Sequence, residues 1–252
     1  MNGPFFYLPP EAWGPGVCLE GQEARHLAQV LRLTPGCEVG LLDGQGRRGR
    51  FVLRAVNKKS ARLERLEEET LPRPKALAVM ALAFSKAVRR GFFMEKAVEL
   101  GAHGVWLWQG DHSQGRLPAA ARETCRGQMV AGAKQSGNAW LPDVRALTGG
   151  VDQLVSLAAT ADYRILPWEM QDGVPMLTPD LAGRPGLTVY VIGPEGGFSE
   201  RELAALRTAG FTAVSLGGRV LRCETAATLC LGLHWWAAQL PGGPDAGGGS
   251  PA

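Results

Sequence analysis

The hydrophobic pattern divides the chain into two parts, and the first part is rich in short strands. Residues 50–56 alternate between apolar and polar side chains with a period near two, which is typical of a strand with one buried face. Asp-Gly-Gln-Gly at residues 43–46 predicts a tight turn before that strand. An amphipathic segment predicts one helix over residues 23–31. We therefore expect residues 1–72 to form a small β-rich domain, with a barrel as the favoured form.

Beyond residue 72 the pattern changes, and strands alternate with helices. Continuous apolar segments predict strands that are buried on both faces, with helices between them. The predicted strands cover residues 76–84, 104–108, 163–167, 187–192 and 213–216, and the predicted helices cover residues 92–100, 116–136, 199–209 and 223–240. This order predicts an α/β domain over residues 73–240 with a largely parallel sheet. Residues 241–252 are rich in Gly, Pro and Ser, and we expect them to be disordered.

The composition excludes several classes of protein. The chain has 252 residues, of which 45% are hydrophobic and 20% are charged, as in ordinary soluble proteins. It has no run of 18 apolar residues and no basic, apolar leader, so we expect no membrane helix and no secretion signal. Five cysteines without a Cys-x-x-Cys spacing favour reduced thiols in a cytoplasmic protein. The net charge of +3 arises within residues 1–75, where 12 Lys and Arg face 9 Asp and Glu, and hints at an anionic partner.

Two glycine-rich segments each follow a predicted strand and precede a predicted helix. Gly-Pro-Glu-Gly-Gly-Phe-Ser occupies residues 193–199, where Ser199 and Glu202 match a capping box, and Leu-Gly-Gly-Arg-Val-Leu-Arg-Cys-Glu-Thr-Ala occupies residues 216–226. Glycine lets a backbone approach a ligand closely, and loops at the carboxyl ends of parallel strands commonly bind ligands. We expect neighbouring strands to place the two loops side by side. Simple tight turns are the alternative interpretation, and neither segment matches a standard nucleotide-binding motif.

Together these segments resemble the signature of the RsmE family, the 16S ribosomal RNA (uracil-N3) methyltransferases of the SPOUT superfamily. Other parts of the family pattern follow in the right order over roughly residues 20–240: Arg-His-Leu at 25–27, Val-Leu-Arg at 30–32, Ser-Lys at 85–86, Met-Glu-Lys-Ala-Val-Glu-Leu-Gly at 94–101 and Lys-Gln-Ser at 134–136. The resemblance implies a PUA-like RNA-binding β-barrel over residues 1–72. It further implies a SPOUT α/β domain with a deep trefoil knot over residues 73–240.

The resemblance also implies an activity and a cofactor. The activity would be S-adenosylmethionine-dependent methylation of uridine N3 in 16S rRNA, at uridine 1498 of the conventional rRNA numbering. The partners would be 16S rRNA or the small ribosomal subunit and a second copy of the chain in a homodimer, without membrane or metal. Three loops of the knot would hold the cofactor: residues 166–169, which end at Glu169, residues 193–197 and residues 216–222. The residues carried over for this role are Leu166, Pro167, Gly193, Glu195, Gly196, Gly197, Leu216, Gly217, Arg219 and Leu221. We expect Gly196→Val to abolish cofactor binding.

Methylation at N3 requires loss of the N3 proton and correct placement of the base. Arg222 is the candidate for stabilising the developing uracil anion. Glu195 or Glu224 would accept the proton or orient the base. For each of the three, a loop-bracing ion pair or a helix cap explains the residue about equally well.

The candidate RNA contacts lie mainly in the first domain. The family pattern carries over Arg25, His26 and Arg32, together with Lys86 in the second domain. A basic cluster that contains Arg47, Arg48, Arg50, Arg54, Lys58, Lys59, Arg62 and Arg65 fits contact with phosphates. Taken alone, that cluster is better explained as a solvated strand surface.

The chain departs from the family pattern at several places, and two other functions stay open. Gln-Gly-Asp-His-Ser-Gln at residues 109–114 replaces the usual Ser-x-Arg-Ser, and Asn138 stands where Arg is common. A SPOUT ribose 2′-O-methyltransferase is one alternative, although its final loop typically reads Ser-Leu-Asn-Val-Ser rather than the residues seen at 221–226. A non-catalytic RNA-binding protein with a degenerate knot is the other, and the intact glycines argue against it.

Two further groups have simpler explanations. Cys223, Cys230 and His234 share one predicted helix, but zinc sites use tighter spacing and more ligands, so we expect no metal. Trp235 and Trp236 are expected in the core or at a dimer interface.

Overall fold

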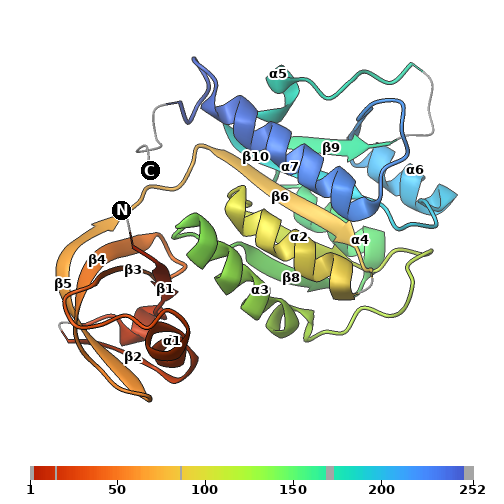
Figure 1. The fold of residues 1–252 in the computed structure, drawn as a ribbon. Coiled ribbons are helices and arrows are strands. Elements are labelled where there is room, and N and C mark those ends of the chain that lie inside the picture. The colour runs from red at the N-terminus through yellow and green to blue at the C-terminus, as the bar shows by residue number, and fades with distance from the viewer. Residues whose placement is uncertain (1–2, 15, 86, 169–172, 247–252) are drawn as a thin grey trace. The chain divides into compact units, whose positions relative to one another are not determined.

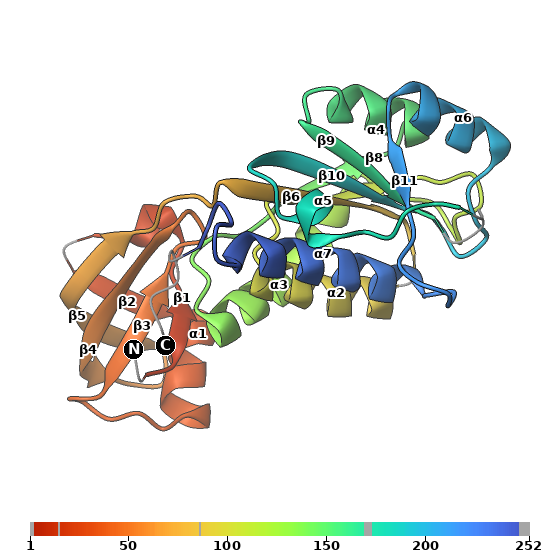
Figure 2. The ribbon, with the colours of Figure 1, turned by 90° about the horizontal axis from the view of Figure 1, so that it is seen from above.

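The computed structural model describes residues 3–14, 16–85, 87–168 and 173–246, and these form two compact units (Figures 1 and 2). The first unit contains the described residues of Met1–Arg73 together with Val130–Leu141. The second contains those of Pro74–Met129 and Pro142–Pro251. The segment Val130–Leu141 belongs to the first unit although the sequence pattern predicts it within the second domain. Its Lys134 ammonium lies 2.9 Å from the Glu23 carboxylate of the first unit, which helps to explain this placement.

The first unit is a curled five-stranded sheet (Figure 1). Its strands are β1 (Phe5–Tyr7), β2 (Val17–Glu20), β3 (Glu38–Leu42), β4 (Arg47–Val56) and β5 (Ser60–Thr70), in the spatial order β1-β3-β4-β5-β2. β1 and β3 are parallel, and the other pairs are antiparallel. Two register shifts interrupt the long β4–β5 ladder. Because such irregularities bend and twist a strand, they help the sheet to curl around a core that includes Phe6, Leu41 and Phe51.

The short helices and the turn of the first unit follow the sequence closely. The predicted helix appears as α1 (Gly21–Arg25) continued by the π-helical turn η2 (His26–Val30), and a 3-10 turn, η1 (Pro10–Ala12), precedes β2. The predicted turn at residues 43–46 is confirmed. The Asp43 carboxylate accepts hydrogen bonds from the backbone N–H groups of Gln45 and Arg47 at 2.7 and 3.0 Å. Gly44 and Gly46 both have positive φ, which only glycine adopts without strain.

The second unit is built on a six-stranded sheet in which every pair of neighbours is parallel, as predicted. The strands are β6 (Ala76–Ala83), β7 (Gly104–Trp108), β8 (Asp143–Leu147), β9 (Tyr163–Pro167), β10 (Gly186–Ile192) and β11 (Thr212–Val214). Their spatial order is β11-β9-β10-β6-β7-β8. β10 thus lies between β6 and β9, and β9 separates β10 from β11. The predicted adjacency of the last two strands is therefore wrong.

Helices cover both faces of this sheet (Figure 2). They are α2 (Ala87–Glu99), α3 (Ala121–Ser136), α4 (Gly150–Ala158), α5 (Pro179–Ala182), α6 (Glu200–Thr208) and α7 (Cys223–Gln239). Since side chains alternate along a strand, Val189 and Val191 of β10 pack in one core with Leu154 of α4 and Leu206 of α6. Tyr190 points to the other face, where its hydroxyl lies 3.2 Å from Nδ1 of His234 on α7.

Several boundaries differ from the predicted ones for local reasons. Helix α3 begins at Ala121 rather than at residue 116, because Pro118 lies in the predicted first turns and favours a helix start after it. Residues 241–246 form turns instead of the expected disorder, and the Asp245 carboxylate accepts a hydrogen bond from the Lys75 backbone at 2.7 Å. Residues 247–252 lie outside the described residues. Among the described residues, no helix is long and apolar enough to cross a membrane.

Candidate functional site

The carboxyl ends of β9, β10 and β11 lie at one edge of the parallel sheet, and the segments that follow them enclose a pocket. Its volume of about 250 Å³ is several times that of a water molecule, so it admits an organic ligand. The lining comes from three segments and the start of α7: Pro167 and Trp168; Ile192, Gly193, Pro194, Glu195, Gly197 and Phe198; Leu216, Gly217, Arg219, Val220, Leu221 and Arg222; Cys223 and Ala226. Sheets of this type usually bind ligands at this edge.

The structure therefore joins the two glycine-rich segments in one pocket, although their strands are not neighbours. β9 stands between β10 and β11, and its end, Pro167, contributes to the same wall. The sequence pattern correctly predicts that the two glycine-rich segments lie close together. The prediction assumes that their strands, β10 and β11, are neighbours, which they are not. Three strand ends build the site: two carry the glycine-rich segments, and the third is implied by the family resemblance alone.

Most of the predicted cofactor residues line the pocket, and two do not. The Leu166 side chain is buried in the core of the second unit. Gly196 is not part of the lining, and a Cβ there would lie 2.8 Å from Cβ of His112. The residues that do line it are Pro167, Gly193, Glu195, Gly197, Leu216, Gly217, Arg219 and Leu221. Glu169 lies outside the described residues.

Of the three predicted catalytic residues, Arg222 and Glu195 line the pocket and Glu224 does not. Glu224 lies in the first turn of α7 and accepts a hydrogen bond from the Cys223 thiol at 3.3 Å. Six apolar or thiol residues of the lining were not named individually by sequence reasoning: Ile192, Pro194, Phe198, Val220, Cys223 and Ala226. Of these, Pro194 and Val220 lie within the predicted cofactor loops, and the other four lie outside them. All six lie in or beside the two glycine-rich segments, so their position next to those glycines was the available signal.

Two glycines of the pocket wall have backbone conformations that other residues rarely adopt. Gly197 has φ +78 and Gly217 has φ +111. At both positions, apart from the two chain neighbours, no atom of the described residues lies within 4 Å of the place that a Cβ would take. The backbone is thus bare and open at these two points, which is the arrangement that lets a ligand approach the main chain.

The remaining walls combine apolar surface with a few charges. Leu216, Leu221 and Ala226 provide apolar surface, and Arg222 and Glu195 provide charges of opposite sign. Such a pocket suits a ligand that carries both a flat apolar group and charged groups.

Cys223, at the start of α7, faces the pocket as a neutral thiol. Burial raises the pKa of this thiol to about 11, and the carboxylates of Glu224 and Glu195 act in the same direction. Because only the thiolate is strongly nucleophilic, Cys223 does not supply a nucleophile at neutral pH. Among the described residues, no group of three or more His, Cys, Asp or Glu side chains could hold a metal ion.

The helix that follows the first glycine-rich segment begins as predicted. The Ser199 hydroxyl accepts a hydrogen bond from the Glu202 backbone at 3.2 Å, and the Glu202 carboxylate accepts one from the Ser199 backbone at 2.8 Å. This capping box marks the start of α6 at a defined residue. Glu202 is fully buried, which is unusual for a carboxylate and indicates a network around it.

The basic cluster of the first unit is largely paired with carboxylates. Arg48 lies 2.7 Å from Glu69, and Arg50 lies 3.0 Å from Glu67, across the β4–β5 ladder. Arg47 lies 3.7 Å from the Asp43 carboxylate. An RNA phosphate would compete with these carboxylates, so the geometry favours a solvated strand surface over a phosphate-binding face.

The other predicted RNA contacts have different surroundings. Arg25 and Arg32 are exposed, and neither has an ion-pair partner within the part of the chain that the structure describes. Arg32 has φ +54, a left-handed conformation, directly after the π-helical turn that contains half-buried His26. Irregular helical turns of this kind are frequent at functional sites. Lys86 lies outside the described residues.

Comparison with protein families and known proteins agrees with this arrangement. The RNA methyltransferase domain family matches residues 72–235, and the RNA methyltransferase PUA domain family matches residues 19–64. Ribosomal RNA small subunit methyltransferase E of Mycobacterium bovis is 32% identical over 222 residues, which cover 85% of this chain and 84% of that protein.

Solved structures of similar proteins contain a bound cofactor. Ribosomal RNA small subunit methyltransferase E from Neisseria gonorrhoeae, bound to S-adenosyl methionine, is 29% identical with a TM-score of 0.79, and the match covers 94% of this chain and 97% of that one. A Legionella pneumophila protein in complex with the cofactor SAM is 26% identical with a TM-score of 0.82, covering 94% and 98% of the two chains.

Proposed function

This chain belongs to the family of ribosomal RNA small subunit methyltransferases E, and on that premise we propose that it methylates N3 of a uridine in 16S rRNA. The chain is an S-adenosylmethionine-dependent rRNA methyltransferase. The choice of uridine N3, at position 1498 of the conventional rRNA numbering, follows from the resemblance of residues 193–199 and 216–226 to the RsmE signature. The observation that carries the proposal is that these two segments line one pocket.

The residues of the pocket fit S-adenosylmethionine. This cofactor combines a flat adenine ring with a positively charged sulfonium and an amino-acid group. Apolar side chains such as Leu216 and Leu221 would hold the ring. Glu195 would favour the positive charge, and the bare backbone at Gly197 and Gly217 would allow close contact. Pro167, Gly193 and Arg219 complete the set of proposed cofactor contacts.

When bound, S-adenosylmethionine supplies an electrophilic methyl group on sulfur. The protein must then place the uracil N3 in line with that group and favour loss of the N3 proton. Arg222, with its permanent positive charge at the pocket, would stabilise the negative charge that develops on the uracil. Glu195 shares the pocket with Arg222 and is the better placed of the two carboxylates to receive the proton, because Glu224 does not line it.

The proposed knot has support from the strand order. β10 follows β9 in the chain but lies between β9 and β6, so the chain re-enters the interior of a sheet already formed by earlier strands. The segments that line the pocket begin directly after this inserted strand and after β11. An experimental electron-density map that traces the chain through residues 163–240 tests the knot. A chain that passes through no loop in that map would refute it.

We place the RNA-binding face of the first unit at Arg25, His26 and Arg32 rather than on β4. Arg25 and Arg32 are exposed and have no carboxylate partner among the described residues, so they are available to contact phosphates. Arg48 and Arg50, by contrast, are already paired. The proposed partner is 16S rRNA or the small ribosomal subunit, and the proposed location is the cytoplasm.

A homodimer is the proposed working unit, and exposed apolar residues support it. Phe92 on α2 and Leu229, Trp235 and Trp236 on α7 are each 38–51% exposed. Helices α2 and α7 pack against each other, so these side chains belong to neighbouring helices. Large apolar side chains exposed on two neighbouring helices support an interface there, where they would form a contiguous patch.

Titration of S-adenosylmethionine into the purified protein tests the pocket. We expect saturable binding to the wild type and at least about tenfold weaker binding to Ala226→Leu, whose longer side chain fills the pocket from the first turn of α7. Thr225→Leu is the matched control, because the neighbouring residue is exposed and does not line the pocket. If Ala226→Leu and Thr225→Leu bound S-adenosylmethionine with equal affinity, this pocket would not be the cofactor site.

A further inference from the structure

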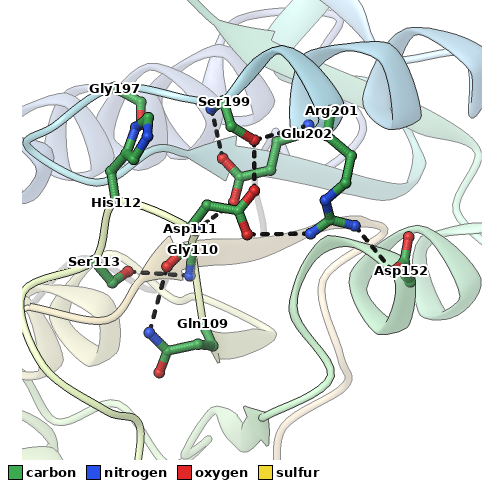
Figure 3. Close-up of polar contacts among 10 residues, drawn as sticks. All are labelled: Gln109, Gly110, Asp111, His112, Ser113, Asp152, Gly197, Ser199, Arg201 and Glu202. Carbon is green, nitrogen blue, oxygen red and sulfur yellow. Dashed lines mark hydrogen bonds and ion pairs between the residues drawn. The ribbon is translucent and has the colours of Figure 1, made fainter.

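Residues 109–113, here called the β7 loop, lie against the first glycine-rich segment. That segment, residues 193–199, is here called the glycine loop. The β7 loop follows β7 and contains the sequence that departs from the family pattern. Figure 3 shows the side chain of His112 pointing at Gly197 of the glycine loop, and that of Asp111 pointing at Ser199 and Arg201 at the start of α6. None of its residues lines the pocket.

Asp111 joins the β7 loop to the start of α6. One oxygen of its carboxylate accepts a hydrogen bond from the Ser199 hydroxyl at 2.6 Å, and the other accepts one from the Arg201 guanidinium at 3.1 Å (Figure 3). The Ser199 hydroxyl and then the Arg201 guanidinium hold the pKa of the Asp111 carboxyl below its ordinary value. Asp111 is therefore ionised at neutral pH and keeps both contacts.

A buried carboxylate fixes the same junction from the other side. Glu202 accepts a hydrogen bond from the Asp111 backbone N–H at 2.8 Å with one oxygen, and from the Ser199 backbone N–H with the other. Arg201 extends the network to α4, where it donates to the Asp152 carboxylate at 3.1 Å. Because each partner has its position set by at least one other element, the end of the glycine loop at Ser199 has little freedom to move.

His112 contacts the middle of the glycine loop. Its Nδ1 lies 3.1 Å from the carbonyl oxygen of Gly197. Since a carbonyl can only accept, Nδ1 carries the proton and donates. Gly197 is one of the two glycines whose bare backbone faces the pocket, so His112 holds the reverse side of a residue that forms the pocket wall.

The glycines of both loops show how closely the two segments pack. A Cβ on Gly196 would lie 2.8 Å from Cβ of His112, and a Cβ on Gly110 would lie 3.2 Å from the ring of Pro194. Gly196 has no positive φ. The need for glycine at residue 196 therefore comes from the β7 loop, and a contact with the ligand is not required to explain it.

We propose that the β7 loop is a clamp that holds the glycine loop in its cofactor-binding conformation, with Asp111 and His112 as positioning residues. This inference rests on the proposed function, because it assigns the pocket to S-adenosylmethionine. A loop that is already ordered before binding loses less conformational entropy when the ligand arrives. Loosening the clamp thus lowers affinity for the cofactor. Saturating cofactor orders the glycine loop again, with Glu195 in it, so kcat at saturation changes little.

The first test separates cofactor affinity from the chemical step. We expect Asp111→Asn and His112→Ala to raise the KM and the dissociation constant for S-adenosylmethionine by about tenfold, with kcat at saturating cofactor changed by less than about threefold. Asp143→Asn is the matched control, because that carboxylate also pairs with an arginine, Arg145, at 2.7 Å but stands at the start of β8. Its cofactor affinity stays at the wild-type value.

The second test is a double-mutant cycle across the contact between the loops. Gly196→Ala alone places a methyl group against His112 and weakens cofactor binding. His112→Gly alone removes the hydrogen bond to Gly197 and also weakens binding. In the double variant the methyl group occupies the vacated space, so we expect an affinity no lower than that of His112→Gly alone. Independent effects would instead multiply.

The outcomes are distinguishable. If the wild type binds S-adenosylmethionine and Asp111→Asn and His112→Ala bind it equally well, the clamp is refuted and the proposed function stands. If the wild type does not bind it, the proposed function fails and the clamp fails with it. If Asp111→Asn or His112→Ala does not fold, the double-mutant cycle still tests the clamp. Losses of cofactor affinity in Gly196→Ala and His112→Gly that multiply in the double variant would refute it.

Discussion

At the residue scale, the pocket brings two arginines, Arg219 and Arg222, and one carboxylate, Glu195, to the proposed cofactor site. Arg222 stands at the end of the second glycine-rich segment, immediately before α7, and Glu195 stands within the glycine loop. The two side chains come from segments after different strands, so their meeting depends on the sheet order. The neutral thiol of Cys223, which also lines the pocket, supplies no competing nucleophile.

Arg222→Ala tests the role of the cation. We expect kcat to fall by about 10²–10³, the usual effect of removing one group that stabilises a developing negative charge. Affinity for S-adenosylmethionine should change much less, because the charge on the uracil develops only during the reaction. Steady-state kinetics with titrated cofactor separates the two effects. A variant with wild-type kcat would show that Arg222 only braces the loop.

At the element scale, single glycines decide whether neighbouring segments can pack. Gly46 has φ +97, and a Cβ on it would collide with the ring of Trp140. We expect Gly46→Ala to cost roughly 2–4 kcal/mol, from left-handed strain and overpacking together. Gly127 in α3 is the matched control, since it is exposed and open. Its replacement by Ala should stabilise the helix by up to about 1 kcal/mol.

Thermal unfolding of the two variants provides the measurement. The melting temperature should fall by several degrees for Gly46→Ala and rise slightly for Gly127→Ala, given about 2–4 °C per kcal/mol for a chain of this size. A melting temperature for Gly46→Ala at or above that of Gly127→Ala would contradict the packing described here.

The elements also show how far sequence patterns reach. β7 and β9 have the predicted boundaries, and β7 ends where its apolar run meets the polar Gln109. The capping box at Ser199 sets the start of α6. The strand β8 and the helix α4 escaped prediction because they are short and only partly apolar. The position of β10 between β6 and β9 could not be predicted, because strand order depends on contacts between distant segments.

The same limit applies to the site. The glycine-rich motifs identified both main segments of the pocket, since glycine is required where backbone is bare. Asp111 and His112 were noted only as a departure from the family pattern, because their partners Ser199 and Gly197 lie more than 80 residues away in the chain. Contacts over such separations appear only in the folded structure.

At the scale of the whole molecule, the chain joins a unit that matches the RNA methyltransferase PUA domain family to one that matches the RNA methyltransferase domain family, and it exposes apolar residues on α2 and α7. We expect Trp236→Glu to shift a homodimer toward monomer, because a charge in an apolar interface loses its hydration. Thr160→Glu, exposed beyond the end of α4, is the control and keeps the wild-type mass. Light scattering after size exclusion gives the masses. A wild-type protein that is monomeric at all concentrations would refute the dimer.

The central claim is that this chain methylates N3 of a uridine in 16S rRNA. The most direct measurement is to incubate the protein with labelled S-adenosylmethionine and either 16S rRNA or small ribosomal subunits that lack the modification, and then to identify the labelled nucleoside by mass spectrometry. The account predicts N3-methyluridine at a single position and none with Arg222→Ala over the same time. Label in a 2′-O-methylated nucleoside would contradict the base assignment, and no label in either substrate would contradict the account as a whole.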